Sequence, residues 1–255
     1  MAKRRDKESI AKFSAVVQRH MDSERKRGTG GLLSGIVLGG QYGLVNVLGI
    51  VLGVASATSD QFIVIVAGLV ATFAESVSMA AVAYASSRAE ADHYKRELAQ
   101  ERWEIEHLPE VEEEEIRLIY MKKGYRGKEL AQMVKNTVSN KEMWLSVMMN
   151  EELGMNAPDD AAPFNAALVV GASAIVGSLI PLLPFILLPV QESIYASVAL
   201  ATLVLFSAGA YKAKIKVGSW LKSGAEMAFV GMLAALVGFV VGKLAGEWFG
   251  MNKVS

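Results

Sequence analysis

The sequence predicts an all-α, polytopic membrane protein with five transmembrane helices and one acidic helical insert on the cytoplasmic side. Hydrophobic residues make up 52% of the 255 positions, and they fall in long uncharged blocks. The net charge of zero conceals an asymmetry, because residues 89–160 carry 17 of the 26 acidic residues and only 10 basic ones. We therefore expect lipid around most of the chain and water around residues 89–160.

The uncharged stretch 31–57 predicts the first span, because about 1.5 Å per residue is enough to cross roughly 30 Å of hydrocarbon. A second apolar run follows the turn Thr58–Gln61 and extends to Ser87. The remaining spans are expected at 161–191, 193–211 and about 220–249. Three prolines in the third apolar run predict a kinked or re-entrant end there: Pro181, Pro184 and Pro189.

Residues 89–160 are charged with periodic apolar positions, and Pro109, Gly124 and Gly127 divide them into at least three helices. The expected organisation is thus a cytoplasmic amphipathic segment at 1–28, spans one and two at 29–88, the insert at 89–160, and spans three to five at 161–255. The segment 1–28 lacks the short apolar core and cleavage site of a signal peptide.

Basic residues gather on one side of the predicted spans, which is the cytoplasmic side in membrane proteins. The opposite loops, 58–60 and 189–192, contain no Lys or Arg. The N-terminus and the insert are therefore expected inside and the C-terminus outside, and the absence of organelle signals favours a prokaryotic cell membrane. The basic flanks are Arg25, Lys26 and Arg27; Arg88, Lys95 and Arg96; and Lys212, Lys214, Lys216 and Lys222.

Two glycine stripes predict close helix packing, one at Gly31, Gly35, Gly39 and Gly43 and one at Gly238, Gly242 and Gly246. The partner helix can belong to the same chain, or the stripe can form a homodimer seam.

The composition excludes several chemistries. Without cysteine the chain has no thiolate, so a metal ion must be held by carboxylate, thioether, imidazole or backbone oxygen. No nucleotide-binding loop, nucleophile elbow or catalytic triad occurs, so we expect no enzyme, no organic cofactor and no nucleic-acid partner.

Paired acidic residues in the insert predict a site for divalent metal ions. Glu101 and Glu104 are three residues apart, Glu112 and Glu115 repeat this spacing, and each pair projects from one helix face. Further on, Met148 and Met149 precede Glu152 by four and three residues, which adds thioethers to a carboxylate. This mixed ligand set favours first-row transition ions such as Fe²⁺ over Mg²⁺ or Ca²⁺. The spacing equally fits a solvated charge run with methionines as core filler.

Within the membrane, Glu75 is the most informative residue, because an ionisable side chain there is costly and usually faces an ion path or a partner. Met79 follows one helical turn later on the same face. Tyr42, with Gln41 and Asn46, forms a polar island in span one that can line the same path or satisfy itself within the bundle.

These residues lie in motifs that resemble the vacuolar iron transporter family from about Gly39 to Gly246. The motifs are GGQYGLVNVLGIVLGV at 39–54, ESVSMAAVAY at 75–84, EADHYKREL at 90–98, MWLSVMMNEELGM at 143–155 and GSLIPLLPF at 177–185. The resemblance implies a five-span dimeric protein that exchanges cytosolic Fe²⁺ and related divalent ions against protons, with the ion path between the subunits. It also implies that the insert binds metal through Glu101, Glu104, Glu112, Glu115, Met148, Met149 and Glu152.

The sequence departs from the family pattern in the membrane. Tyr42 stands where the first span of the family commonly has an aspartate, and Ala71 stands where many members have a glutamate. The family's methionine is retained as Met79. Glu75 lies one turn beyond Ala71 and can replace the missing carboxylate from the same face.

The leading hypothesis is a homodimeric transporter that gathers Fe²⁺, Mn²⁺, Zn²⁺ or Co²⁺ on the insert and passes it to Glu75 and Met79, out of the cytosol and against protons. The alternative is a metal-binding membrane sensor or buffer that conducts nothing. A transporter of an unrelated small solute is a third reading, which requires an insert that binds no metal.

Overall fold

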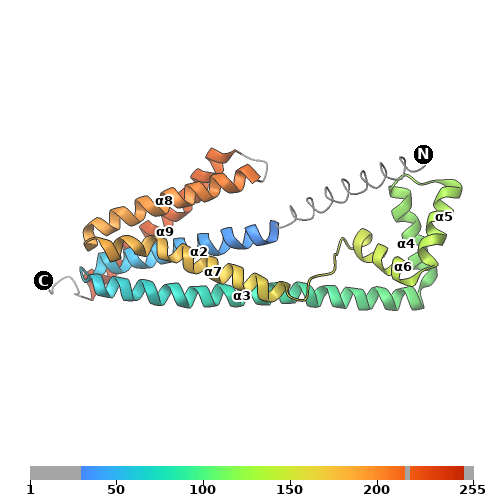
Figure 1. The fold of residues 1–255 in the computed structure, drawn as a ribbon, viewed down its shortest axis with the longest axis horizontal. Coiled ribbons are helices and arrows are strands. Elements are labelled where there is room, and N and C mark those ends of the chain that lie inside the picture. Colours follow the sequence, from blue (N-terminus) through green and yellow to red (C-terminus); the bar gives the residue numbers. More distant parts are fainter. Residues whose placement is uncertain (1–29, 216–218, 250–255) are drawn as a thin grey trace, which may run out of the picture. The chain divides into compact units, whose positions relative to one another are not determined.

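The computed structural model describes residues 30–215 and 219–249, and every secondary-structure element within these ranges is a helix (Figure 1). Five of these helices are long and apolar enough to cross a membrane. The predicted all-α class and the five spans are confirmed. They are α2 (Gly30–Ala57), α3 (Gln61–His107), α7 (Ala162–Leu187), α8 (Val190–Ile215) and α9 (Trp220–Trp248). The expected amphipathic segment 1–28 and Lys216 lie outside the described residues.

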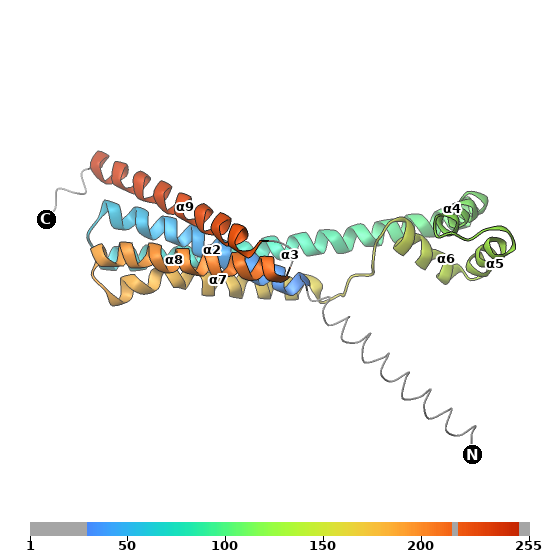
Figure 2. The same cartoon turned by 90° about the horizontal axis from the view of Figure 1, so that it is seen from above.

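The contacts divide the chain into two compact units, and the first unit comprises the described residues up to Val82 and from Ala166 onward. In this unit α2 lies alongside α8 and α9, as both views show (Figures 1 and 2). Successive turns of α2 place Leu44, Val47, Leu48 and Val51 in the core, each at most 2% exposed. The core is completed from α7 and α8, chiefly by Leu182, Phe185 and Leu205.

Both glycine stripes pack against helices of the same chain. In α2, Gly39 and Gly43 face the α7 backbone at Val170 and Ala174. In α9, the glycines face α2, with Gly242 against the carbonyl of Gly53. The alternative that placed these stripes at a homodimer seam is therefore wrong, because helices of the same chain already occupy the faces that lack side chains.

Gly242→Ala is expected to destabilise the fold of the single chain. A Cβ at position 242 would meet the backbone of Gly53, which cannot move aside, so we expect a loss of about 1–3 kcal/mol in the free energy of unfolding. Thermal unfolding in detergent measures it. Gly40→Ala is the matched control, because a Cβ there would meet only Ser173 at 3.6 Å. Equal unfolding temperatures for the two variants would contradict the assignment.

The proline-rich end of the third span is continuous helix. α7 runs through Pro181 and Pro184 to Leu187, so of the two expected alternatives, a kinked or a re-entrant end, the re-entrant one is wrong. Each proline lacks the N–H that would bond to the carbonyl four residues earlier, which is Gly177 for Pro181 and Ile180 for Pro184. Ser197 Oγ donates to the carbonyl of Pro181 at 2.6 Å and Ser193 Oγ to that of Pro184 at 2.9 Å. These hydroxyls tie α8 to the proline-containing turns of α7, and the N–H of Leu188 also donates to the Pro184 carbonyl at 2.8 Å.

The second unit comprises Ala83–Asn165 and contains the end of α3 and four shorter elements. Pro109 is the first residue of α4, and Gly124 (φ 100°) and Gly127 (φ 55°) form the turn that follows it. Buried apolar side chains hold the unit together, among them Ile105, Ile116 and Trp144. The four elements are α4 (Pro109–Lys122), α5 (Gly127–Val138), α6 (Lys141–Val147) and the π-helix η1 (Met148–Glu152).

Candidate metal centre

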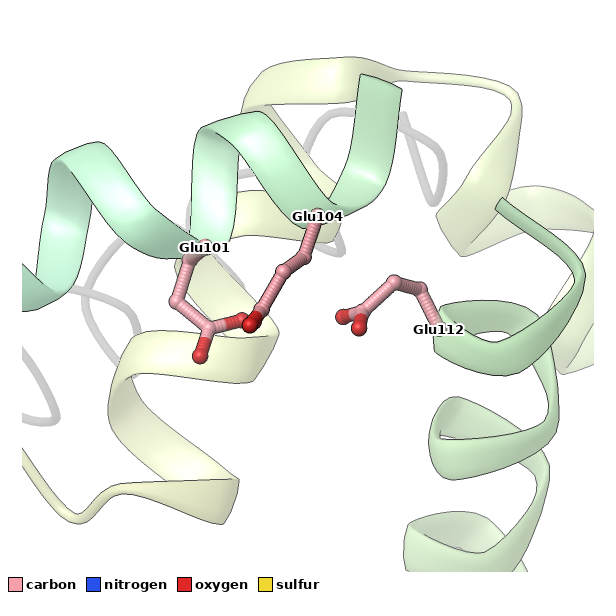
Figure 3. A group of neighbouring side chains, drawn as sticks. All are labelled: Glu101, Glu104 and Glu112. Atoms are coloured by element: carbon pink, nitrogen blue, oxygen red, sulfur yellow. The ribbon is translucent and has the colours of Figure 1, made fainter. Parts of the chain in front are cut away.

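Three carboxylates meet where the end of α3 faces the start of α4. Glu101 and Glu104 project from α3 and Glu112 from α4, and Figure 3 shows their carboxyl groups turned toward one another. Each offers an oxygen, and these oxygens all lie within 4.8 Å of one another. The Pro109 turn between the helices brings the two predicted glutamate pairs face to face through these three residues.

The helical repeat explains why Glu112 points inward. Glu112, Ile116 and Tyr120 recur every four residues and are the buried residues of α4. Glu101 is similarly placed one turn before the buried Ile105 of α3. The side chains of Glu101 and Glu112 are only 6% and 3% exposed. If the acidic run were only a solvated helix face, Glu112 would be exposed to water. Its burial therefore distinguishes Glu112 from the rest of the run.

The negative charges of these two buried carboxylates are not balanced by hydrogen-bond donors or basic side chains among the described residues. One oxygen of each, Oε2, is buried and has no hydrogen-bond partner among the described residues. Burial, followed by repulsion from neighbouring glutamates, raises the pKa of both Glu101 and Glu112 to about 7. The cluster must therefore take up protons or a cation when it is formed.

Other acidic residues of the insert have basic partners. Arg117 donates to Glu114 at 2.8 Å, and Lys123 pairs with Glu151. Within the described residues, no such ion pair involves Glu101, Glu104 or Glu112. Arg117 and Lys123 thus pair with other acidic residues of the insert and leave the cluster itself open to an added cation.

The remaining predicted ligands lie around this group. Glu115, half-buried on α4, and Glu152 both repel Glu101 and Glu112, and partial desolvation of its carboxyl group raises the pKa of Glu152 as well. Met148 and Met149 are fully buried in η1, which packs against α4. Met148 also belongs to the apolar core of the insert, the role that the core-filler reading gave it. π-Helical turns are rare and frequently occur at functional sites.

Metal binding by the insert is expected to weaken as the pH falls from 8 to 6. An ion displaces protons from carboxyl groups, and at a pKa of about 7 each of Glu101 and Glu112 is roughly nine-tenths protonated at pH 6. The dissociation constant for Mn²⁺ should therefore rise about tenfold if one proton is displaced and about a hundredfold if two are. Calorimetry at constant ionic strength measures this. Glu101→Gln should flatten the dependence, and an affinity independent of pH would contradict it.

In the membrane unit, the predicted path residues share the facing sides of α2 and α3. Asn46 Nδ2 donates a hydrogen bond of 2.5 Å to Glu75 Oε1. Tyr42, which is 49% exposed, lies one turn before Asn46, and the half-buried Met79 lies one turn after Glu75. The sequence placed Asn46 with Tyr42 in the polar island that can line the path, but it did not predict the contact of Asn46 with Glu75. Because two consecutive spans run antiparallel, residues at similar distances from the turn between them face one another. This pairing could have identified Asn46 as the partner of Glu75.

Five spans, together with a candidate carboxylate site in a separate helical unit, define an integral, multi-pass membrane protein. Comparison with known proteins agrees with this class, because a family model described as the VIT family matches residues 33–243. The chain belongs to the VIT family.

Its relatives carry consistent names. The "Vacuolar iron transporter 1" of Arabidopsis thaliana is 30% identical over 223 residues, which cover 87% of this chain and 89% of the relative. The protein of the same name from Eucalyptus grandis is 29% identical and covers 84% and 86%. The "Vacuolar iron transporter" of Toxoplasma gondii is 32% identical and covers 85% and 75%. The family and these names support metal-ion transport as the class of function.

Proposed function

We propose that the protein transports Fe²⁺ or a related divalent transition metal ion out of the cytosol in exchange for protons. The observation that carries the proposal is the meeting of Glu101, Glu104 and Glu112, in a chain whose described residues include five helices able to cross a membrane. Glu101 and Glu112 are buried, and one oxygen of each has no hydrogen-bond partner among these residues. The insert gathers the ion on these residues with Glu115, Met148, Met149 and Glu152.

The ligand chemistry supports a transition metal ion as the transported substrate. Clustered carboxylates bind any divalent cation, whereas the thioethers of Met148 and Met149 are soft ligands that favour Fe²⁺ and similar ions. Mn²⁺, Zn²⁺ and Co²⁺ belong to the same set. The names of the relatives favour iron within it.

Glu75 supports a path through the membrane and an exchange of protons. A carboxylate at mid-membrane must pair with a cation or take up a proton, because an unpaired charge there costs several kcal/mol or more. A side chain that alternates between a metal ion and a proton couples their movements in opposite directions. Met79 and Tyr42 complete the proposed path.

The direction of transport rests on the orientation deduced from the basic flanks, which places the insert in the cytosol. The resemblance to the family supports a homodimer whose ion path lies between the two copies. The names of the relatives refer to a vacuole and so give no support to the prokaryotic cell membrane expected from the sequence.

Reconstitution into liposomes tests the proposal. The purified protein should move Fe²⁺, kept reduced, or Mn²⁺ across the membrane, followed by a metal-sensitive dye inside the vesicles. A proton gradient opposed to the metal movement should accelerate it.

The rival function, a metal sensor or buffer, predicts a different result in the same vesicles. It requires metal binding by the protein without flux above that of empty liposomes. Flux without any metal binding by the insert would instead favour transport of another solute.

A further inference from the structure

Glu75 has a specific partner in the neighbouring membrane helix. Between Gln61 and Ser87 it is the one Asp, Glu, Lys, Arg or His residue, and the stretch Gly30–Ala57 of α2 has none. Asn46 of α2 reaches it with an N–H donor at 2.5 Å. Asn46 lies 11 residues before the end of α2 at Ala57, which corresponds to about 16 Å, close to the middle of a layer of roughly 30 Å.

This contact leaves oxygen atoms available to a cation. Glu75 Oε2 is buried and has no hydrogen-bond partner among the described residues. The amide of Asn46 uses its nitrogen as the donor, and its carbonyl oxygen Oδ1 is bonded to the same carbon and can still accept. Asn46 is also exposed on the single chain. Because polar groups open to hydrocarbon are costly, this side is expected to face an aqueous path or a second copy.

We propose that Asn46 is a direct ligand of the transported ion, and that it forms one site together with Glu75. This inference rests on the proposed function and extends it to a residue on α2. The N–H of Asn46 fixes the orientation of the carboxylate, and Asn46 Oδ1 and Glu75 bind a divalent transition metal ion from opposite helices. The thioether of Met79, one turn from Glu75, lies on the same side of α3.

The charge of this pair explains why it suits passage of an ion instead of its storage. An amide oxygen is a neutral ligand, so the site carries one negative charge against two positive charges on the ion. Conduction requires a site that binds an ion well enough to admit it but weakly enough to release it. The insert, with several carboxylates, is built for tighter binding, and the Asn46–Glu75 pair is built for turnover.

The test exchanges the amide of Asn46 and the carboxylate of Glu75 between α2 and α3 while keeping the size and shape of both side chains. Asn46→Asp and Glu75→Gln are each isosteric, and together they move the carboxylate to α2 and the amide to α3. In liposomes with Mn²⁺ as the probe, Glu75→Gln alone should lose at least nine-tenths of the flux. The double variant should regain at least a third of it.

Single substitutions at position 46 separate binding from a structural role. Asn46→Leu should reduce flux at least tenfold without lowering the unfolding temperature enough to explain the loss. Asn46→Asp should lower both the KM for Mn²⁺ and the maximal rate, because a second carboxylate binds the ion more tightly and releases it more slowly. Ser207→Ala in α8, where the hydroxyl bonds to its own helix at Leu203, is the control and should transport normally.

The outcomes distinguish this inference from the proposed function. If the unmodified protein moves no metal, the proposed function itself fails. If it moves metal and Glu75→Gln stops it, but Asn46→Leu transports normally or the double variant stays inactive, Asn46 is not a ligand and the inference is overturned.

Discussion

Replacing Glu112 and Glu115 together by alanine is expected to remove most high-affinity metal binding and leave the protein folded. The change deletes one of the three clustered carboxylates and a half-buried neighbour that repels it. Altering groups outside the coordination sphere typically costs about 10- to 100-fold in metal affinity. Loss of a ligand should exceed this, so we expect a decrease of more than about a hundredfold by calorimetry.

The acidic run of α4 offers a matched control for this experiment. Glu113→Ala with Glu114→Ala removes the same charge from the same helix, but Glu114 is exposed and pairs with Arg117. The control should keep the affinity within about threefold, because long-range charge is screened by salt. Equal losses of metal affinity in both double variants would show that the acidic run acts only as a solvated helix face. Met148→Leu and Met149→Leu should change ion preference more than overall affinity.

Glu75→Gln is expected to abolish metal flux and its response to a proton gradient, while metal binding by the insert stays intact. Glutamine keeps the shape of the side chain and can still accept a hydrogen bond from Asn46. It cannot carry a negative charge or exchange a proton, so neither of the two states needed for coupled transport is available. Flux in liposomes and calorimetry on the same preparation measure the two properties separately.

A second glutamate provides the control for the same chemical change. Glu226 is exposed at the start of α9 within 4.0 Å of Lys222, and Glu226→Gln should transport normally. If Glu75→Gln also transports normally, Glu75 is a hydrogen-bonding contact between helices. The sensor or buffer function would then be favoured over the transporter.

The membrane spans could be predicted from the sequence because lipid imposes a length and a polarity on each helix that the chain must satisfy locally. The end of α7 could not. Pro181 and Pro184 usually break helices in soluble proteins, yet α7 runs through both, and Ser197 and Ser193 of α8 bond to their carbonyls. Contacts with another helix cannot be read from a local sequence pattern. The glycine stripes predicted close helix packing without identifying the partner helices. The structure shows that α7 packs against the stripe of α2, and that α2 packs against the stripe of α9.

The sequence predicted which residue types form the candidate site, but it did not predict which of them are buried or lie together. The spacing of Glu112, Ile116 and Tyr120 could have singled out Glu112 as the buried member of its run, since the three form one stripe of α4. Met148 shows the reverse case, because thioethers suit both a metal site and an apolar core, and the structure places this one in the core of the insert. Contact between Asn46 and Glu75 depends on the register of α2 against α3, which a one-residue slip would change.

Anomalous scattering from crystals of the protein soaked in Fe²⁺ or Mn²⁺ tests the central claim, that the insert binds the transported ion through its carboxylates. The account predicts a peak at the absorption edge of the added metal between Glu101, Glu104 and Glu112, absent from the Glu112→Ala and Glu115→Ala double variant. Peaks confined to exposed acidic residues such as Glu110 and Glu114, with none between these three side chains, would contradict it.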